Sequence, residues 1–302
     1  MLNVILETCA GTLTQGLIYA ILSYGIFITY KILDFPDLTV DGSFPLGAAV
    51  TAVLLTHGVN AWLTLPIALV IGALAGLCTG LIHVRAKVRD LLAGIITMTA
   101  LYSINLQIAG SNLMVERAID TIYTSAPVMA LLGSVPLLYR KLIVSLVLVV
   151  LIGRVLEWYF STKNGLLLRA VGDNDTLVTT LAVDKGRMKI LGLVIANALV
   201  ALSGCIVCQE GRSFSATMGT GQMVFGLAAV IIGTTLFRRM SFVKGTAAVV
   251  IGSILYKACI QIAILLGLPG NMLKFITAAL FLVILITGNL SGRKGGADRA
   301  GA

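Results

Sequence analysis

The sequence predicts an all-α membrane protein with about nine transmembrane helices, roughly eight to ten. The chain has 302 residues and a mean hydropathy of +1.00, and 12% of its residues are charged. A soluble domain usually carries about 25% charged residues. The apolar stretches are long and continuous, whereas strands of a membrane β-barrel would alternate apolar and polar residues. Since backbone groups in lipid must be hydrogen-bonded within the protein, continuous stretches of this kind indicate helices.

About nine apolar stretches approach the ~20 residues that a helix needs to cross a bilayer. We expect these helices at residues 8–30, 35–56, 62–83, 91–109, 141–160, 188–209, 221–237, 245–266 and 271–289. A short re-entrant piece is a further candidate around 121–135. The chain is therefore expected to form one membrane domain over 1–290, followed by a disordered basic cytoplasmic tail over 291–302.

Basic residues predict the orientation of the helices. With the N-terminus outside, most Lys and Arg residues fall on the cytoplasmic side, among them Lys31, Arg85 and Arg169. This bias predicts a multi-pass protein of the bacterial inner (plasma) membrane, surrounded by lipid. The net charge of +9 is then a signature of topology. It does not indicate nucleic-acid binding, which would require a basic cluster on a soluble surface.

Small residues predict close helix packing. Gly72, Gly76 and Gly80 recur every four residues on one expected helix. Small residues let backbones approach each other where lipid supplies no hydrophobic driving force. We expect this ridge to pack against another helix, with a specific dimer interface as the alternative.

A polar segment at residues 34–45 interrupts the start of the second expected helix. It holds three aspartates and two prolines. Charges at membrane depth are costly and usually face protein or a cavity. The segment is either a broken helix lining a translocation pathway or an interfacial cytoplasmic loop with solvated aspartates. The pathway candidates here are Asp37, Thr39, Asp41 and Ser43.

Other polar residues lie inside the expected helices. Thr97, Asn105 and Asn197 are further pathway candidates, although polar side chains also join helices through hydrogen bonds. Lys257 lies near the middle of the eighth expected helix. It either extends its ammonium group to the membrane surface or faces the protein interior.

The largest cytoplasmic segment, around 161–189, contains a possible docking helix. Asp173 or Asn174 is a suitable N-cap for a short helix ending near Ala182. Such a helix either docks into a partner or only connects two spans. Its candidate residues are Gly172, Asp173, Asn174, Asp175, Thr176, Leu177, Val178 and Leu181.

No pattern of catalytic residues is evident. Cys205 and Cys208 form a CxxC pair, but inside an apolar helix and without a second ligand pair. We expect no metal, no cofactor and no enzymatic activity. A Walker A sequence is also absent from the chain, so any ATP hydrolysis must come from a separate subunit.

Several segments resemble one transporter family. Residues 169–174 read Arg-Ala-Val-Gly-Asp-Asn, and 181–189 read Leu-Ala-Val-Asp-Lys-Gly-Arg-Met-Lys; near the N-terminus, 15–20 read Gln-Gly-Leu-Ile-Tyr-Ala and 37–44 read Asp-Leu-Thr-Val-Asp-Gly-Ser-Phe. Together they resemble the branched-chain amino acid and ribose type of ABC importer permease over about 10–290. The 37–44 segment is similar to a less-studied branch that some members tie to aromatic amino acids, and it differs from the Asn-Phe-Ala-His-Gly-type segment of many members.

The resemblance implies a type II importer permease that forms the translocation pathway for a small polar solute, favouring an amino acid and among these an aromatic one. It also implies a second permease copy, an ABC ATPase that binds the helix at about 173–182, and a periplasmic or lipoprotein solute-binding protein. A homodimer is expected. The alternative is a stand-alone secondary transporter or channel.

Overall fold

The computed structural model describes residues 2–173, 184–237 and 244–267, together with 275, 277–279, 282 and 283. Its helices are α1 (Leu2–Ile26), the π-helix η1 (Phe27–Ile32), α2 (Val40–Thr56), α3 (Ala61–Val84), α4 (Asp90–Ala109), α5 (Ala126–Leu132), α6 (Leu137–Ser161), α7 (Lys163–Asp173), α9 (Lys185–Gly211), α10 (Gln222–Leu236) and α11 (Gly245–Leu265). Two short strands, β1 (Asn112–Met114) and β2 (Ser213–Ser215), pair antiparallel.

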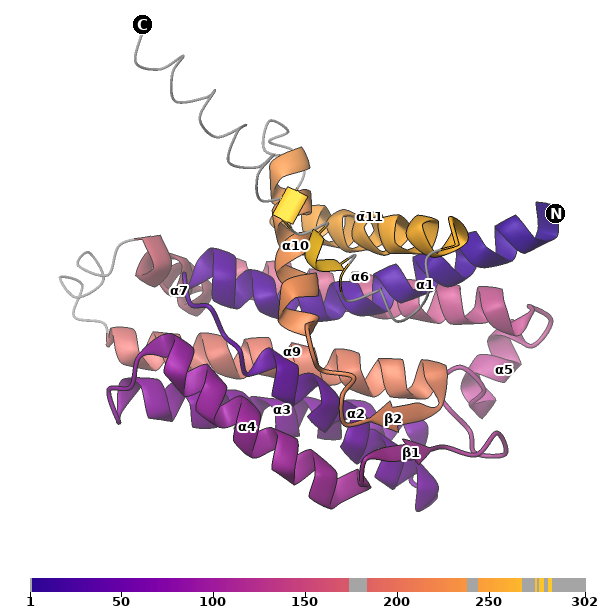
Figure 1. Ribbon diagram of the computed structural model, residues 1–302, viewed down its shortest axis with the longest axis horizontal. Helices are drawn as coiled ribbons and strands as arrows, with labels where there is room; N and C mark the ends of the chain where they lie inside the picture. The colour runs from indigo at the N-terminus through magenta and orange to yellow at the C-terminus, as the bar shows by residue number, and fades with distance from the viewer. Residues whose placement is uncertain are drawn as a thin grey trace, which may run out of the picture.

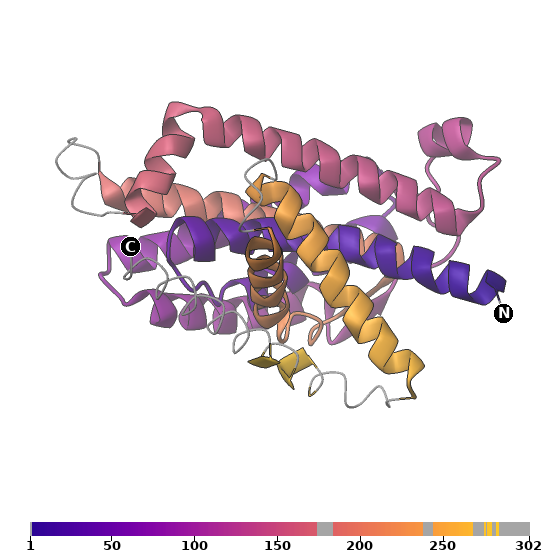
Figure 2. The same cartoon turned by 90° about the horizontal axis from the view of Figure 1, so that it is seen from above.

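Two helices form the centre of the molecule. In α1 with η1, 67% of the most apolar 18-residue stretch is buried, and in α9 72% of the corresponding stretch is buried. The corresponding share is about one third in α3, α4, α6 and α11, which surround this centre. The long helices α1, α3, α6 and α9 run along the same axis, whereas α10 stands across them (Figures 1 and 2). The peripheral helices expose large apolar side chains such as Leu74, Ile96 and Leu151, as contact with lipid requires.

Six helices within the described residues are long and apolar enough to cross a membrane. They correspond to the expected stretches except those at 35–56, 221–237 and 271–289. At 1.5 Å per residue, the 17 residues of α2 and the 15 residues of α10 reach only about 26 and 22 Å, short of a ~30 Å hydrocarbon core. The third stretch and the predicted tail at 291–302 lie largely or wholly outside the described residues. The structure therefore confirms a multi-span α-helical fold, and it does not confirm the count of about nine.

The second helix begins later than the sequence predicted. α2 starts at Val40 instead of residue 35, after a non-helical connection at 33–39. Proline disfavours helical geometry in the residue before it, here Phe35 before Pro36. Asp34, one residue earlier, has a positive φ of 52°, which also breaks the helix. The expected helix at 35–56 is thus a non-helical start followed by the shorter helix α2.

Helix α7 was missed by the sequence analysis, which expected a helix in this segment only from about residue 173. Leu168 and Val171, three residues apart, are both buried, and this i, i+3 pair gives the segment an apolar face. Gly172 packs so closely on the backbone of Ile32 in η1 that a Cβ atom would overlap it. The buried face against η1 explains why this connection is helical.

The glycine ridge of α3 faces α9. A Cβ atom on Gly72 or Gly76 would overlap backbone carbonyl oxygens of Asn197 or Leu193, and one on Gly80 would crowd Ile190. The ridge therefore brings two helices of the same chain together.

We predict that Gly76→Ala lowers the thermal unfolding midpoint of the purified protein in detergent. The added methyl group must displace the α9 backbone, and such overpacking typically costs about 1–3 kcal/mol. Gly11→Ala is the matched control, because Gly11 also lies in an apolar helix but its added methyl group would have no atom of the described residues within 4 Å. Equal midpoints for the two variants would show that the α3–α9 contact tolerates a side chain.

Candidate functional site

The connection at 33–39 places one aspartate in solvent and another in the interior. Asp34 is exposed, as the interpretation of a solvated loop requires. Asp37 is 1% exposed, which agrees with the interpretation of a broken helix. The segment thus combines both predicted characters, and its buried half forms a polar centre.

Asp37 is held by donors from its own turn and from α9. One carboxylate oxygen accepts a hydrogen bond from the Thr39 amide at 2.9 Å, and the other accepts one from Asn197 Nδ2 at 2.7 Å. The Ser43 hydroxyl donates to Asn197 Oδ1 at 2.7 Å. Because charged and polar groups buried without partners are costly, each of these groups depends on the others.

The same network reaches α3 and α4. The hydroxyl groups of Thr39 and Thr79 lie 2.8 Å apart, and Asn105 Nδ2 donates to the Gly42 carbonyl oxygen at 3.1 Å. The start of α2 is therefore fastened to α3, α4 and α9. Thr97, the remaining pathway candidate, is also buried but donates only to the Ala93 carbonyl of its own helix among the bonds described.

Asp41 performs a different task, capping the N-terminus of α10. Its two carboxylate oxygens accept hydrogen bonds from the amides of Met223 at 2.8 Å and Gly221 at 3.0 Å. The first amides of a helix have no partner within that helix, and a carboxylate there also interacts favourably with the helix dipole. Asp41 thus joins the N-termini of α2 and α10, the two apolar helices that are shorter than a membrane span.

Six of the seven pathway candidates are consequently brought together, whereas the seventh, Thr97, lies on α4 and bonds within that helix. All seven side chains are buried inside this chain except that of Asp41, which is half-buried. In this arrangement the side chains hold broken helices in place. None of the six lines any of the described cavities, so pathway contact by these residues remains a prediction.

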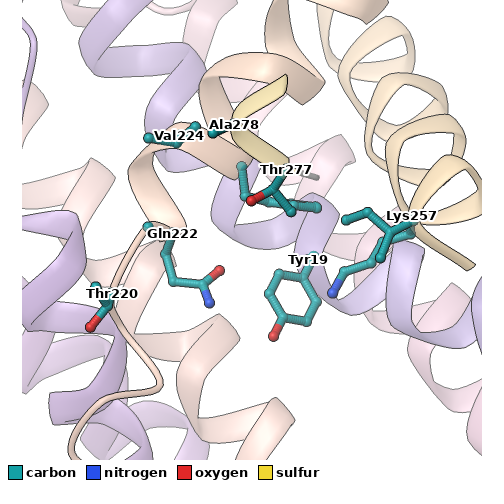
Figure 3. Close-up of a pocket in the computed structure, with 10 residues that line it drawn as sticks. Tyr19, Thr220, Gln222, Val224, Lys257, Thr277 and Ala278 are labelled. Atoms are coloured by element: carbon teal, nitrogen blue, oxygen red, sulfur yellow. The ribbon is translucent and has the colours of Figure 1, made fainter. Parts of the chain in front are cut away.

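A cavity of about 260 Å³ lies beside this centre, between α1, α10 and α11 (Figure 3). Its lining includes Tyr19, Gln222, Phe225 and Lys257. The Lys257 ammonium nitrogen lies 3.6 Å from the centre of the Tyr19 ring and 5.2 Å from that of Phe225. Lys257 therefore faces the interior, one of the two positions that the sequence left open.

The expected docking helix falls almost entirely outside the described residues. Gly172 and Asp173 are the last two residues of α7, and Asn174, Asp175, Thr176, Leu177, Val178 and Leu181 lie beyond them in the undescribed segment 174–183. At the described end of α7, Gly172 packs against the backbone of Ile32 in η1. The described end of α7 therefore lies next to the turn that leads into Asp37.

Comparison with known proteins identifies the family. A family model described as the permease component of the branched-chain amino acid transport system matches residues 8–285. The chain belongs to this family. This permease is therefore a membrane-spanning, non-enzymatic subunit of an ABC importer, located in the bacterial inner membrane. Its family implies an ATPase and a solute-binding protein as partners.

Individual relatives support the same assignment. The permease is 38% identical over 93% of its length, and 91% of the relative's, to a tyrosine transport system permease protein of Clostridioides difficile. It is 34% identical over 74% of its length to the uncharacterized protein RP368 of Rickettsia prowazekii, covering 76% of that protein. It is 26% identical over 78% of its length to the ribose import permease RbsC of Haemophilus influenzae, covering 68% of that chain. No solved structure matches it significantly.

We predict that Asn197→Leu destabilises the permease strongly. The leucine has a similar size but leaves the Asp37 carboxylate and the Ser43 hydroxyl without their partner, and an unsatisfied buried polar group costs about 1–3 kcal/mol. The measurement is the unfolding midpoint in detergent. Thr97→Val is the matched control, since that hydroxyl bonds only within its own helix among the described contacts. The network is not structural if both variants unfold at the wild-type temperature.

Proposed function

We propose that two copies of this permease form the translocation pathway of an importer for an aromatic amino acid, with tyrosine as the first candidate. The observation that carries the proposal is the 38% identity to the tyrosine permease over 93% of the chain. The ribose permease is more distant, at 26% over 78%. The aromatic lining of the cavity beside α10 is consistent with an aromatic solute.

We also propose the membrane topology and the tail. Six spans, the shorter helices α2 and α10, and a last helix over 271–289 would together give about nine helices at membrane depth, of which α2 and α10 do not cross the whole hydrocarbon core. A domain over 1–290 would then end in a basic cytoplasmic tail over 291–302. Asp37, Thr39, Ser43 and the other pathway candidates are also proposed to contact the solute during transport, and Asp41 would link their movement to α10, whose N-terminus it caps.

Uptake in proteoliposomes tests the substrate. The permease would be reconstituted with its cognate ATPase and solute-binding protein, and the uptake of labelled tyrosine, leucine and ribose would be compared. We expect ATP-dependent accumulation of tyrosine that is lost when the ATPase is omitted. Accumulation of ribose in place of tyrosine would contradict the substrate. Uptake driven by an ion gradient without the ATPase would instead favour a secondary transporter.

Energy transfer is proposed to pass through the segment at about 173–182. Leu177, Val178 and Leu181 would offer an apolar contact at helical spacing to the ATPase. We predict that Leu177→Asp with Leu181→Asp abolishes co-purification of the ATPase and uptake, while the permease remains folded because no span is changed.

Leu166→Asp is the control for the added charge, because Leu166 is exposed on the neighbouring helix α7. This variant should retain the ATPase. If the double variant also retains the ATPase and transports at the wild-type rate, the segment is only a connection between α7 and α9.

Native mass spectrometry of the same preparations would show whether the permease is a homodimer.

A further inference from the structure

The cation inside α11 has no acidic partner among the described residues. Lys257 is the thirteenth residue of α11, so it lies about 18 Å along the helix from Gly245 and about 12 Å from Leu265. No carboxylate of the described residues forms a salt bridge with it. An ammonium group at this depth is costly and normally marks a ligand or ion pathway. Two aromatic rings stabilise it in part.

A second unsatisfied polar group borders the same cavity. Gln222 donates through Nε2 to the Met218 carbonyl at 2.8 Å, but its Oε1 atom is buried without a hydrogen-bond partner in the described part of the chain. Buried polar atoms in native proteins almost always have partners. Figure 3 shows the Gln222 amide and the Lys257 ammonium group pointing toward the Tyr19 side chain from opposite sides. Within the described residues, the cavity therefore presents a positive charge with aromatic contacts but no salt bridge, and an acceptor oxygen without a donor.

Two aromatic side chains, Tyr19 and Phe225, form part of the cavity wall. The rings of Tyr19 and Phe225 lie 5.0 Å apart edge to face, and Phe225 contacts Tyr256 in the same way. Such a wall packs well against another ring or a flat apolar group. The cation, the acceptor and the aromatic wall together suit a ligand that has a carboxylate, an ammonium group and a ring.

We propose that this cavity binds the transported amino acid within the membrane domain, with the solute carboxylate on Lys257 and its ammonium group on the Gln222 oxygen. This rests on the proposed function, to which it adds a binding site and a reason for selecting amino acids over sugars. A lipid headgroup offers the same anionic chemistry, but Lys257 lies about 12 Å or more from either end of α11. The solute is therefore the occupant that the position favours.

Weak binding to the purified permease provides the test. The permease would be placed in nanodiscs of phosphatidylcholine alone, and saturation-transfer NMR would detect tyrosine, 3-phenylpropionate, which keeps the carboxylate, and tyramine, which lacks it. We expect signals from the first two and a much weaker one from tyramine. Lys257→Met should weaken tyrosine binding about tenfold to hundredfold, the range for a hydrogen bond to a charged group. Lys257→Arg should restore most of it.

Lys31→Met is the matched control, because Lys31 is exposed in η1 and lies outside the cavity; it should bind tyrosine as wild type does. Each variant's unfolding midpoint establishes that it is folded. Unchanged tyrosine binding by folded Lys257→Met, or equal binding of tyramine, would overturn the site. A tyrosine signal from wild type that disappears when phosphatidylglycerol is added would assign the cavity to lipid headgroups instead.

The transport assay separates failure of the site from failure of the function. If wild-type proteoliposomes accumulate no amino acid, the proposed function fails. If they accumulate tyrosine and Lys257→Met does so at the same rate, only the site fails. We expect Lys257→Met to lower the uptake rate at saturating binding protein while the ATPase remains stimulated, an effect that a purely structural lesion would not produce.

Discussion

Two carboxylates satisfy the polar groups of broken helices where water is scarce. A helix that stops inside a membrane leaves amides and carbonyls without partners, and lipid supplies none. Asp37 accepts from Thr39 and Asn197 at the break between η1 and α2. Asp41 accepts from the first amides of α10. The positions of α2 and α10, and therefore of the cavity beside α10, depend on these bonds.

Close backbone contact allows such short side chains to meet. Gly47 of α2 lies against the Ala201 backbone of α9, and Gly204 of α9 lies against the Phe44 backbone of α2. On the opposite side, the α3 glycines approach α9 in the same manner. At these separations Ser43 reaches Asn197 directly. Small residues thus supply both van der Waals packing and the geometry for hydrogen bonds.

Much of the helical fold could be predicted because hydropathy reports it directly. The spans α3, α4, α6, α9 and α11 begin and end within about four residues of the expected positions, since apolar length is imposed by the bilayer. Two parts differed from the expected helix positions for local reasons. The break at 33–39 shortened α2, and the burial of Leu168 and Val171 against neighbouring elements made α7 helical. Periodicity over so few residues does not distinguish a short helix from a loop.

The sequence by itself determined the membrane class and the family, because composition, span length and motif order are properties of a linear chain. It also marked residues 34–45 as exceptional. Only the tertiary structure decided that Asp37 bonds to Asn197, 160 residues away, that Asp41 caps α10, and that Lys257 faces Tyr19. Each of these depends on which helices pack together and at what rotation, and a one-chain hydropathy pattern contains no information about either.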